Sequence, residues 1–171
     1  MSGTDDARTS LAAAAALLAP ARPSVAEQVL HAFDHPGAYL RDHAGRLANR
    51  GVDEPVPGLA WIALVDALTD HRLLAELDWK EDPQEVRSQL RGLDSRPSVD
   101  PWVLVGEDEM LLPTDEFLRS CGRHYGDVGA ALAVLDIESD CYPVVCLRAA
   151  RVQELTALAN RAGFTAWALG V

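Results

Sequence analysis

Leu59-Ala-Trp-Ile-Ala-Leu-Val-Asp-Ala-Leu68 is the most apolar stretch of helix length in the chain. It has no polar face, because its one charged residue is Asp66. A helix that is apolar all round has to be covered on most of its sides. We therefore expect this segment to be the central helix of the protein, with the other elements packed over it.

The composition limits the class of protein. The chain has 171 residues, of which 49% are hydrophobic, enough for one domain with a substantial core. Its formal net charge is −11 at pH 7. Such a charge repels nucleic acid and anionic lipid, and it favours a basic protein partner or a cation. No apolar run reaches the ~18 residues of a membrane span, so we expect neither a nucleic acid nor a membrane as partner.

Residue usage indicates a bacterial, cytoplasmic protein. Lys80 is the only lysine, whereas arginine and alanine are frequent, as in proteins from GC-rich bacterial genomes. The three cysteines are irregularly spaced, which fits free thiols in a reducing cytosol better than a disulfide framework. The apolar block at 11–21 follows Asp5 and Asp6, where a secretory signal would have basic residues. We therefore predict a docking helix there.

The first half of the chain has the periodicity of helices. Residues 4–18 are rich in strong helix formers. Ser24-Val-Ala-Glu27 has the spacing of a capping box, and Asp82-Pro83 has the residue types that begin a helix. Further predicted helices cover roughly 38–50 and 59–70, and an apolar face continues through Leu73, Leu74 and Leu77.

The second half changes towards strand-like runs. We predict a hairpin from 102–105 and 110–112, then a helix from Thr114 to about Arg123. Strands are predicted at 130–137, 142–147 and 164–169, with a helix at 150–162 between the last two. The first two of these strands are apolar at every position, so both sheet faces should be covered. Strands joined by a crossover helix normally run parallel, which predicts a mixed sheet.

The predicted fold is α+β, an N-terminal helical layer packed on a small mixed C-terminal β-sheet. Residues 1–22 are expected to form an N-terminal helix, and 23–171 a single α+β domain. Within this domain we expect a helical part at 23–93, a linker at 94–101 and a sheet part at 102–171.

Signatures of the best-marked enzyme classes are missing from the sequence. There is no Gly-rich phosphate loop, no His-Glu-x-x-His, no Gly-x-Ser-x-Gly and no paired Cys-x-x-Cys. The sequence therefore favours a protein without enzymatic activity and without a cofactor.

Three acids offer an alternative. Asp136, Glu138 and Asp140 alternate, and alternate side chains of an extended strand point to one side. They could converge on Mg²⁺ or Ca²⁺, which prefer oxygen ligands, in a metal-dependent hydrolase with Asp66 or His124 as base. The commoner interpretation is an acidic turn that serves solubility. Zinc bound by His124 and the cysteines, or a nucleophilic Cys121–His124 pair, is a weaker hypothesis.

Two further positions are candidates for binding. A carboxylate on an all-apolar helix, as at Asp66, carries a desolvation cost and marks either a functional site or a structural ion pair with an arginine. Within Asp78-Trp-Lys-Glu-Asp82, Trp79 is either an exposed recognition anchor or a side chain packed at a helix junction, with Lys80 paired to an acid.

Three short stretches together resemble a bacterial family known only as a domain of unknown function. They are Leu59-Ala-Trp61, Leu77-Asp-Trp-Lys-Glu-Asp82 and Leu135-Asp-Ile-Glu-Ser-Asp-Cys-Tyr142. The resemblance covers roughly residues 25–169, and it implies no catalytic role.

The function that these observations favour is an acidic protein-binding or accessory module, in the manner of an immunity protein. A basic protein is the expected partner, and the alternative is the metal-dependent hydrolase. If a binding site exists, we expect one cleft to be lined by Asp66, Trp79, Lys80, Asp136, Asp140 and Tyr142.

Overall fold

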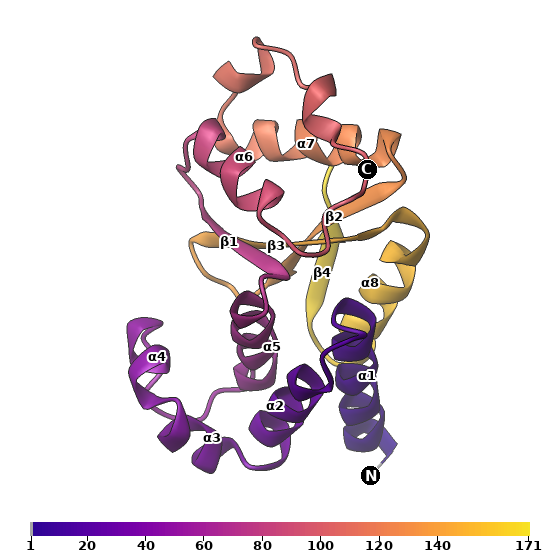
Figure 1. The fold of residues 1–171 in the computed structure, drawn as a ribbon. Coiled ribbons are helices and arrows are strands. Elements are labelled where there is room, and N and C mark those ends of the chain that lie inside the picture. The colour runs from indigo at the N-terminus through magenta and orange to yellow at the C-terminus, as the bar shows by residue number, and fades with distance from the viewer. Residues whose placement is uncertain (1) are drawn as a thin grey trace.

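The computed structural model describes residues 2–171, and its central element is helix α5, Leu59–Asp70. All but three of the residues of α5 are buried. It packs against helix α2 (Pro23–Asp34) on one side and strand β1 (Leu74–Asp78) on the other (Figure 1). The prediction of a central, covered helix is confirmed.

The remaining elements follow in chain order. The other α-helices are α1 (Ser2–Leu18), α3 (Pro36–Asp42), α4 (Ala44–Asn49), α6 (Pro83–Arg91), α7 (Thr114–Asp127) and α8 (Val152–Arg161). Short 3₁₀ helices are η1 (Pro101–Leu104), η2 (Glu109–Leu111) and η3 (Ala149–Arg151). The other strands are β2 (Ala130–Asp136), β3 (Cys141–Arg148) and β4 (Thr165–Ala168).

In residues 2–171 the strands form one sheet in the order β1-β3-β2-β4, and every neighbouring pair is antiparallel. The α+β class is thus confirmed, but the predicted mixed sheet is wrong. Strands β3 and β4 do run in the same direction, because both are antiparallel to β2. They are not neighbours, since β2 pairs with β3 through a short turn and occupies the place between them.

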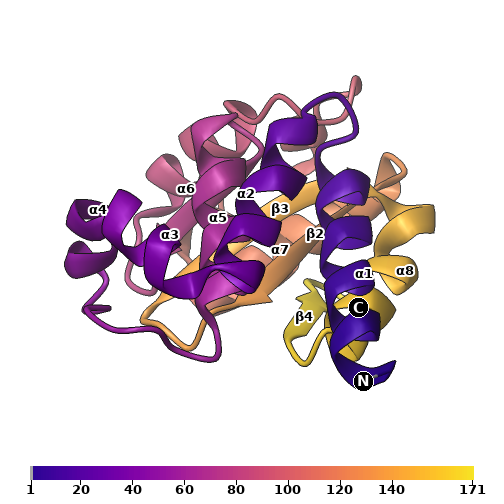
Figure 2. The same cartoon turned by 90° about the horizontal axis from the view of Figure 1, so that it is seen from below.

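Helices cover both faces of the sheet, as predicted (Figure 1). Ala133, Leu135 and Val145 face the core formed with α1, α2, α5 and α8. Leu132, Val134 and Val144, which alternate with them, face the core formed with α6 and α7. Figure 2 shows α1, α2 and α5 side by side over the first of these faces. The sheet is therefore the middle of three layers.

The prediction that Leu73, Leu74 and Leu77 continue a helical face is wrong. Helix α5 ends at Asp70, and Arg72 turns the chain with φ of 59°. In strand β1, Leu74 enters one core and Leu77 the other. A short apolar run fits a helix and a strand equally well, and pairing with β3 decides the outcome here.

Three local predictions are also corrected. The hairpin at 102–112 is replaced by η1 and η2, because the Asp100 carboxylate accepts the Trp102 N–H and caps a 3₁₀ turn. Ser24 forms no capping box, since α2 begins at Pro23 and the Ser24 hydroxyl instead contacts His71. The helix predicted at 38–50 is divided into α3 and α4 at His43.

Other boundaries agree with the sequence. Asp82 caps α6 by accepting the Gln84 N–H, with Pro83 at the first helical position. Helices α1, α7 and α8 and strands β2, β3 and β4 lie where they are predicted, within a few residues. Across residues 2–171, no helix combines the length and hydropathy that crossing a bilayer requires.

Replacement of Gly122 by alanine should destabilise the protein. A Cβ at Gly122, in the middle of α7, would fall on the backbone carbonyl of Leu169, so either α7 or the chain end would have to move. We expect Gly122→Ala to lower the free energy of unfolding by about 1–3 kcal/mol, measured by urea denaturation.

Gly126, one helical turn later, is the matched control. A Cβ there meets no atom within 4 Å. Since alanine favours a helix over glycine by about 1 kcal/mol, Gly126→Ala should be neutral or stabilising. Equal destabilisation by the two changes would contradict the close approach of α7 to Leu169.

Candidate functional site

Trp79 and Lys80 lie where β1 ends, beside the acidic turn that leads into β3. The register of these strands pairs Leu77 with Tyr142 and Asp78 with Cys141. The Trp79 side chain is 52% exposed, and the Lys80 ammonium lies 4.4 Å from the centre of its ring. The alternative of a packed tryptophan at a helix junction is therefore wrong, because Trp79 faces solvent after a strand.

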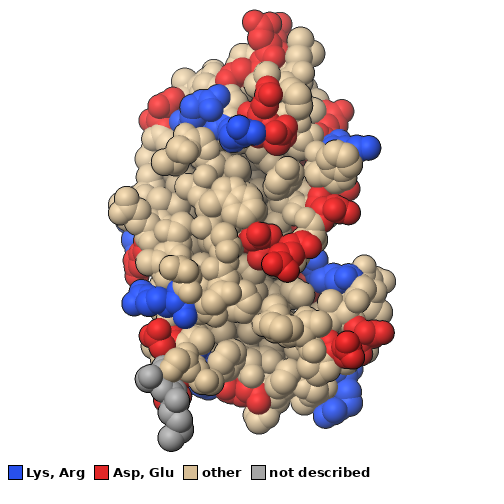
Figure 3. Space-filling view, turned by 180° about the vertical axis from the view of Figure 1, so that it is seen from behind, with Lys and Arg blue, Asp and Glu red and all other residues tan. Residues whose placement is uncertain are grey.

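The surroundings of Trp79 are acidic. Asp78, Asp82, Glu138 and Asp140 are all exposed at this end of the sheet. The Asp78 carboxylate accepts the backbone N–H of Lys80, which closes a tight turn below the ring. Figure 3 shows acidic side chains at the top, near the centre and along both edges of the face that it draws, with basic side chains among them.

The acids Asp136, Glu138 and Asp140 do not converge. Strand β2 ends at Asp136, whose carboxylate accepts the Glu138 N–H at 2.8 Å, and Glu138 has a φ of 58°. The alternation assumed for an extended strand stops there. Within residues 2–171, no three His, Cys, Asp or Glu side chains are grouped so that they could hold a metal ion.

Asp136 instead borders a hollow of about 420 Å³ beneath the start of α5. Glu138 lies on its edge, and Trp61 and Phe164 line it with rings stacked 5.0 Å apart. Asp140 and Trp79 are not among the lining residues. Asp136 is thus separated from the other candidates.

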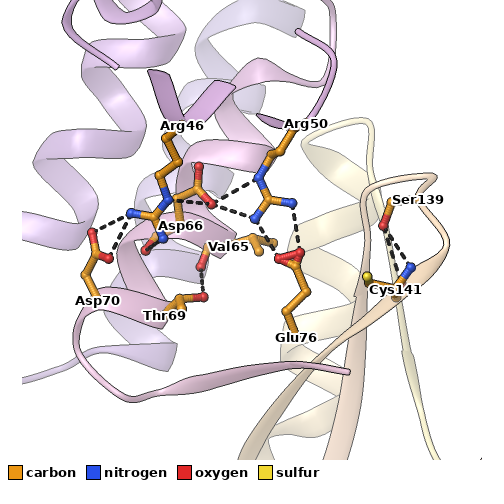
Figure 4. Close-up of polar contacts among 9 residues, drawn as sticks. All are labelled: Arg46, Arg50, Val65, Asp66, Thr69, Asp70, Glu76, Ser139 and Cys141. Atoms are coloured by element: carbon orange, nitrogen blue, oxygen red, sulfur yellow. Dashed lines mark hydrogen bonds and ion pairs between the residues drawn. The ribbon is translucent and has the colours of Figure 1, made fainter. Parts of the chain in front are cut away.

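Asp66 is held by two arginines, as the structural interpretation of its position predicts (Figure 4). Arg50, which follows α4, donates to the Asp66 carboxylate at 2.6 Å and bridges to Glu76 on β1 at 2.6 Å. Arg46 reaches Asp66 at 3.3 Å and Asp70 at 2.8 Å. The hydrogen bond to Glu76, and to a smaller extent the one to Asp66, raises the pKa of the Arg50 guanidinium. The network ties α4, α5 and β1 together.

The six predicted residues therefore occupy three places. Trp79, Lys80, Asp140 and Tyr142 lie at one end of the β1–β3 pair, where Tyr142 is half-buried against the second core. Asp136 borders the hollow below α5, and Asp66 lies inside the ion network. Only the first group presents several side chains to solvent together.

One cluster was not anticipated from the sequence. Glu109 of η2 accepts hydrogen bonds from the Ser120 hydroxyl, His124 Nε2 and the Gly106 N–H. Ser120 and His124 are four residues apart and share one face of α7. This spacing is the sequence signal that could have revealed the cluster. Both donate to the same carboxylate, so the cluster lacks the serine–histidine contact of a nucleophilic site. It fastens the η1–η2 segment to α7.

The cysteines are not activated. Burial raises the pKa of Cys121 and of Cys146 to about 12, and it also raises the pKa of the half-buried Cys141. All three are free thiols. Thiols with such pKa values are protonated near neutral pH and are poor nucleophiles, which counts against the Cys121–His124 pair.

Loss of Arg50 should strongly destabilise the fold. Arg50→Met would leave the Asp66 carboxylate, whose side chain is 2% exposed, without its closest cation. Breaking a buried pair on one side costs about 3–5 kcal/mol. We expect a loss of this size in urea denaturation. Arg8→Met removes an exposed pair with Asp34 and should have little effect, and comparable losses would argue against the role of the network.

Glu109 should make stability depend on pH. The hydrogen bond from Ser120, with those from Gly106 and His124, lowers the pKa of Glu109 from 4.5 to about 2. The folded protein thus binds fewer protons here than the unfolded chain between these values. Its stabilisation is complete above pH 4.5 and is lost as the pH falls to about 2.

Glu109→Gln should therefore lower the free energy of unfolding at pH 7 by roughly 1–2 kcal/mol. In the variant, the free energy of unfolding should also decrease less steeply between pH 4.5 and 2. Denaturant titrations at several pH values measure both effects. Glu107→Gln is the matched control, because its exposed carboxylate has no hydrogen-bond partner among the described residues. An unchanged pH profile in Glu109→Gln would refute the assignment.

Comparison with known proteins adds one finding. The model of a family described as Domain of unknown function (DUF6630) matches residues 10–170. No curated protein and no solved structure matches the chain.

Proposed function

The chain belongs to the family described as Domain of unknown function (DUF6630), and we propose that it is a non-enzymatic binding module. In this proposal the protein presents an acidic surface centred on Trp79 to a basic segment of a protein partner. The location is the cytoplasm of a bacterium, which the arginine-rich, lysine-poor composition and the free thiols support. An accessory or immunity protein would use such a surface.

The exposure of Trp79 carries the proposal. Trp61 and Trp102 are 1% and 5% exposed, whereas Trp79 leaves 52% of its surface in water directly after a buried strand. Tryptophan is among the residues that most often dominate binding energy at protein interfaces. Because the exposed Trp79 ring belongs to neither hydrophobic core, binding to a partner is the best explanation for it.

Exposed apolar side chains continue beyond Trp79. The Thr114 hydroxyl donates to the Glu81 carbonyl at 2.9 Å, which holds the start of α7 beside the loop that carries Trp79. Leu111, three residues before Thr114, is 84% exposed, and Val103 of η1 is 80% exposed. Exposed apolar side chains that lie together mark interaction surfaces, so in this proposal Leu111 and Val103 belong to the same surface as Trp79.

The charge of the surface specifies the partner. Asp78 and Asp82 are exposed on either side of Trp79 in the sequence, and the exposed Asp140 precedes Cys141, the partner of Asp78. The whole chain carries a net charge of −11. The ring already holds the Lys80 ammonium 4.4 Å from its centre, so its face accommodates a cation. An arginine or lysine of a partner can take the same position, with the acids accelerating association.

Trp79→Ala should abolish partner binding without affecting the fold. Tagged protein, in its full length, is used to capture partners from a lysate of the source organism at low and high salt. We expect the wild type to capture a protein through a basic segment, with less capture at high salt. Truncation of a hot-spot tryptophan costs at least about 2 kcal/mol, so capture by Trp79→Ala should fall more than about tenfold.

Trp167→Ala is the matched control, because Trp167 is the other exposed tryptophan, at 38%, and lies on strand β4. It should capture the partner as the wild type does. Equal capture by both variants, or capture that salt leaves unchanged, would refute the proposal.

A further inference from the structure

Three arginines gather around a hollow at the opposite end of β1 from Trp79. Arg72 precedes β1, Arg91 ends α6, and Arg96 lies in the segment that follows α6. Together they line a hollow of about 350 Å³, a volume typical of small-molecule sites. The Asp94 N–H donates to the Arg72 carbonyl at 2.8 Å, which joins the two segments that carry these side chains.

Most of the donors of these guanidinium groups have no acceptor among residues 2–171. A guanidinium has five N–H donors. Arg96 donates one to the Leu93 carbonyl, and Arg91 contacts the Asp100 carboxylate at 3.1 Å. Arg72 reaches the Gly92 carbonyl at 3.5 Å and Asp94 at 3.8 Å. The hollow is therefore lined by charged donors that a bound anion would satisfy.

Two buried aromatic residues form another wall of the hollow. Trp102 is 5% exposed, and its ring lies edge-on to that of Tyr125, with the ring centroids 6.3 Å apart. Burial raises the pKa of Tyr125 well above its usual range, so its hydroxyl stays protonated. The wall thus offers aromatic surface to an organic group attached to a bound anion.

The local charge favours an anion in spite of the acidic chain. The lining residues comprise three arginines and one carboxylate, Asp100, which is engaged with Arg91 and the Trp102 backbone N–H. The helix dipole of α6 places a partial negative charge, roughly half an elementary charge, at its C-terminus. Distant acids are screened over about 8 Å at physiological salt. With Asp94, which lies 3.8 Å from Arg72, three arginines face two carboxylates, so a small net positive charge remains.

We propose that this Arg72–Arg91–Arg96 pocket binds the phosphate group of a small phosphorylated molecule. The planar fork of arginine matches the oxygens of a phosphate. A tetrahedral phosphate offers oxygens in three directions at once, which suits three arginines around one hollow, whereas a carboxylate offers only two oxygens. The proposal is independent of the Trp79 surface.

Calorimetric titration of the full-length protein tests it, with inorganic phosphate, phenyl phosphate and acetate as probes. We expect inorganic phosphate to bind with a millimolar or lower Kd. Phenyl phosphate should bind more tightly, since its ring can contact the aromatic wall, and acetate should bind more weakly than either. Phosphate should also raise the Tm, because it binds the folded state.

Variants assign the binding to the pocket. Arg72→Gln and Arg96→Gln should each weaken phosphate binding at least tenfold, while Arg8→Gln, an exposed arginine paired with Asp34, should leave it unchanged. The Tm of each variant without phosphate shows whether it is folded. Absence of heat and of a Tm shift with every probe would overturn the proposal. So would equal weakening in Arg8→Gln, or acetate binding as tightly as phosphate.

Discussion

Burial of α5 against one face of the sheet is the constraint on which the rest of the structure depends. Most of this helix is removed from water, so its one buried carboxylate, Asp66, must be neutralised inside the protein. Asp66 therefore requires Arg50 and Arg46, which brings α4 alongside α5. Arg50 then engages Glu76 and fixes β1. The one buried charge of this apolar helix thus helps to determine the positions of α4, α5 and β1.

The same burial decides where binding can occur. Helices occupy both faces of the sheet, so neither face is open to a ligand. The ends of the strands, the outer layer of α6, η1 and η2, and the hollow beside Asp136 are open to a ligand. Both candidate surfaces lie there: Trp79 follows β1, and Arg72 precedes it. Segments that lack a core of their own can present large or charged side chains to solvent.

The sequence predicts most of the fold because its local signals are strong. The cap at Asp82, the apolar α5 and the β2–β3 pair are each determined within about twenty residues of continuous sequence. Strand β1 is missed because its apolar run suits either a helix or a strand. The site is harder to predict. An arginine partner for Asp66 is foreseen, but its identity depends on contacts 16 residues apart in the chain. The acids near Asp136 separate because a left-handed residue ends the strand.

Strand β1 lies between the two candidate surfaces. It is an edge strand, and exposed edges invite pairing with other chains unless charges or neighbouring elements protect them. Glu76 and Asp78 place carboxylates on it, and Arg50 covers one of them. At ~3.3 Å per residue, its five residues separate Arg72 from Trp79 by only about 20 Å. A charged, protected edge thus lies between a basic pocket and an acidic surface, so the anion and the basic segment that we propose as ligands would not compete for the same side chains.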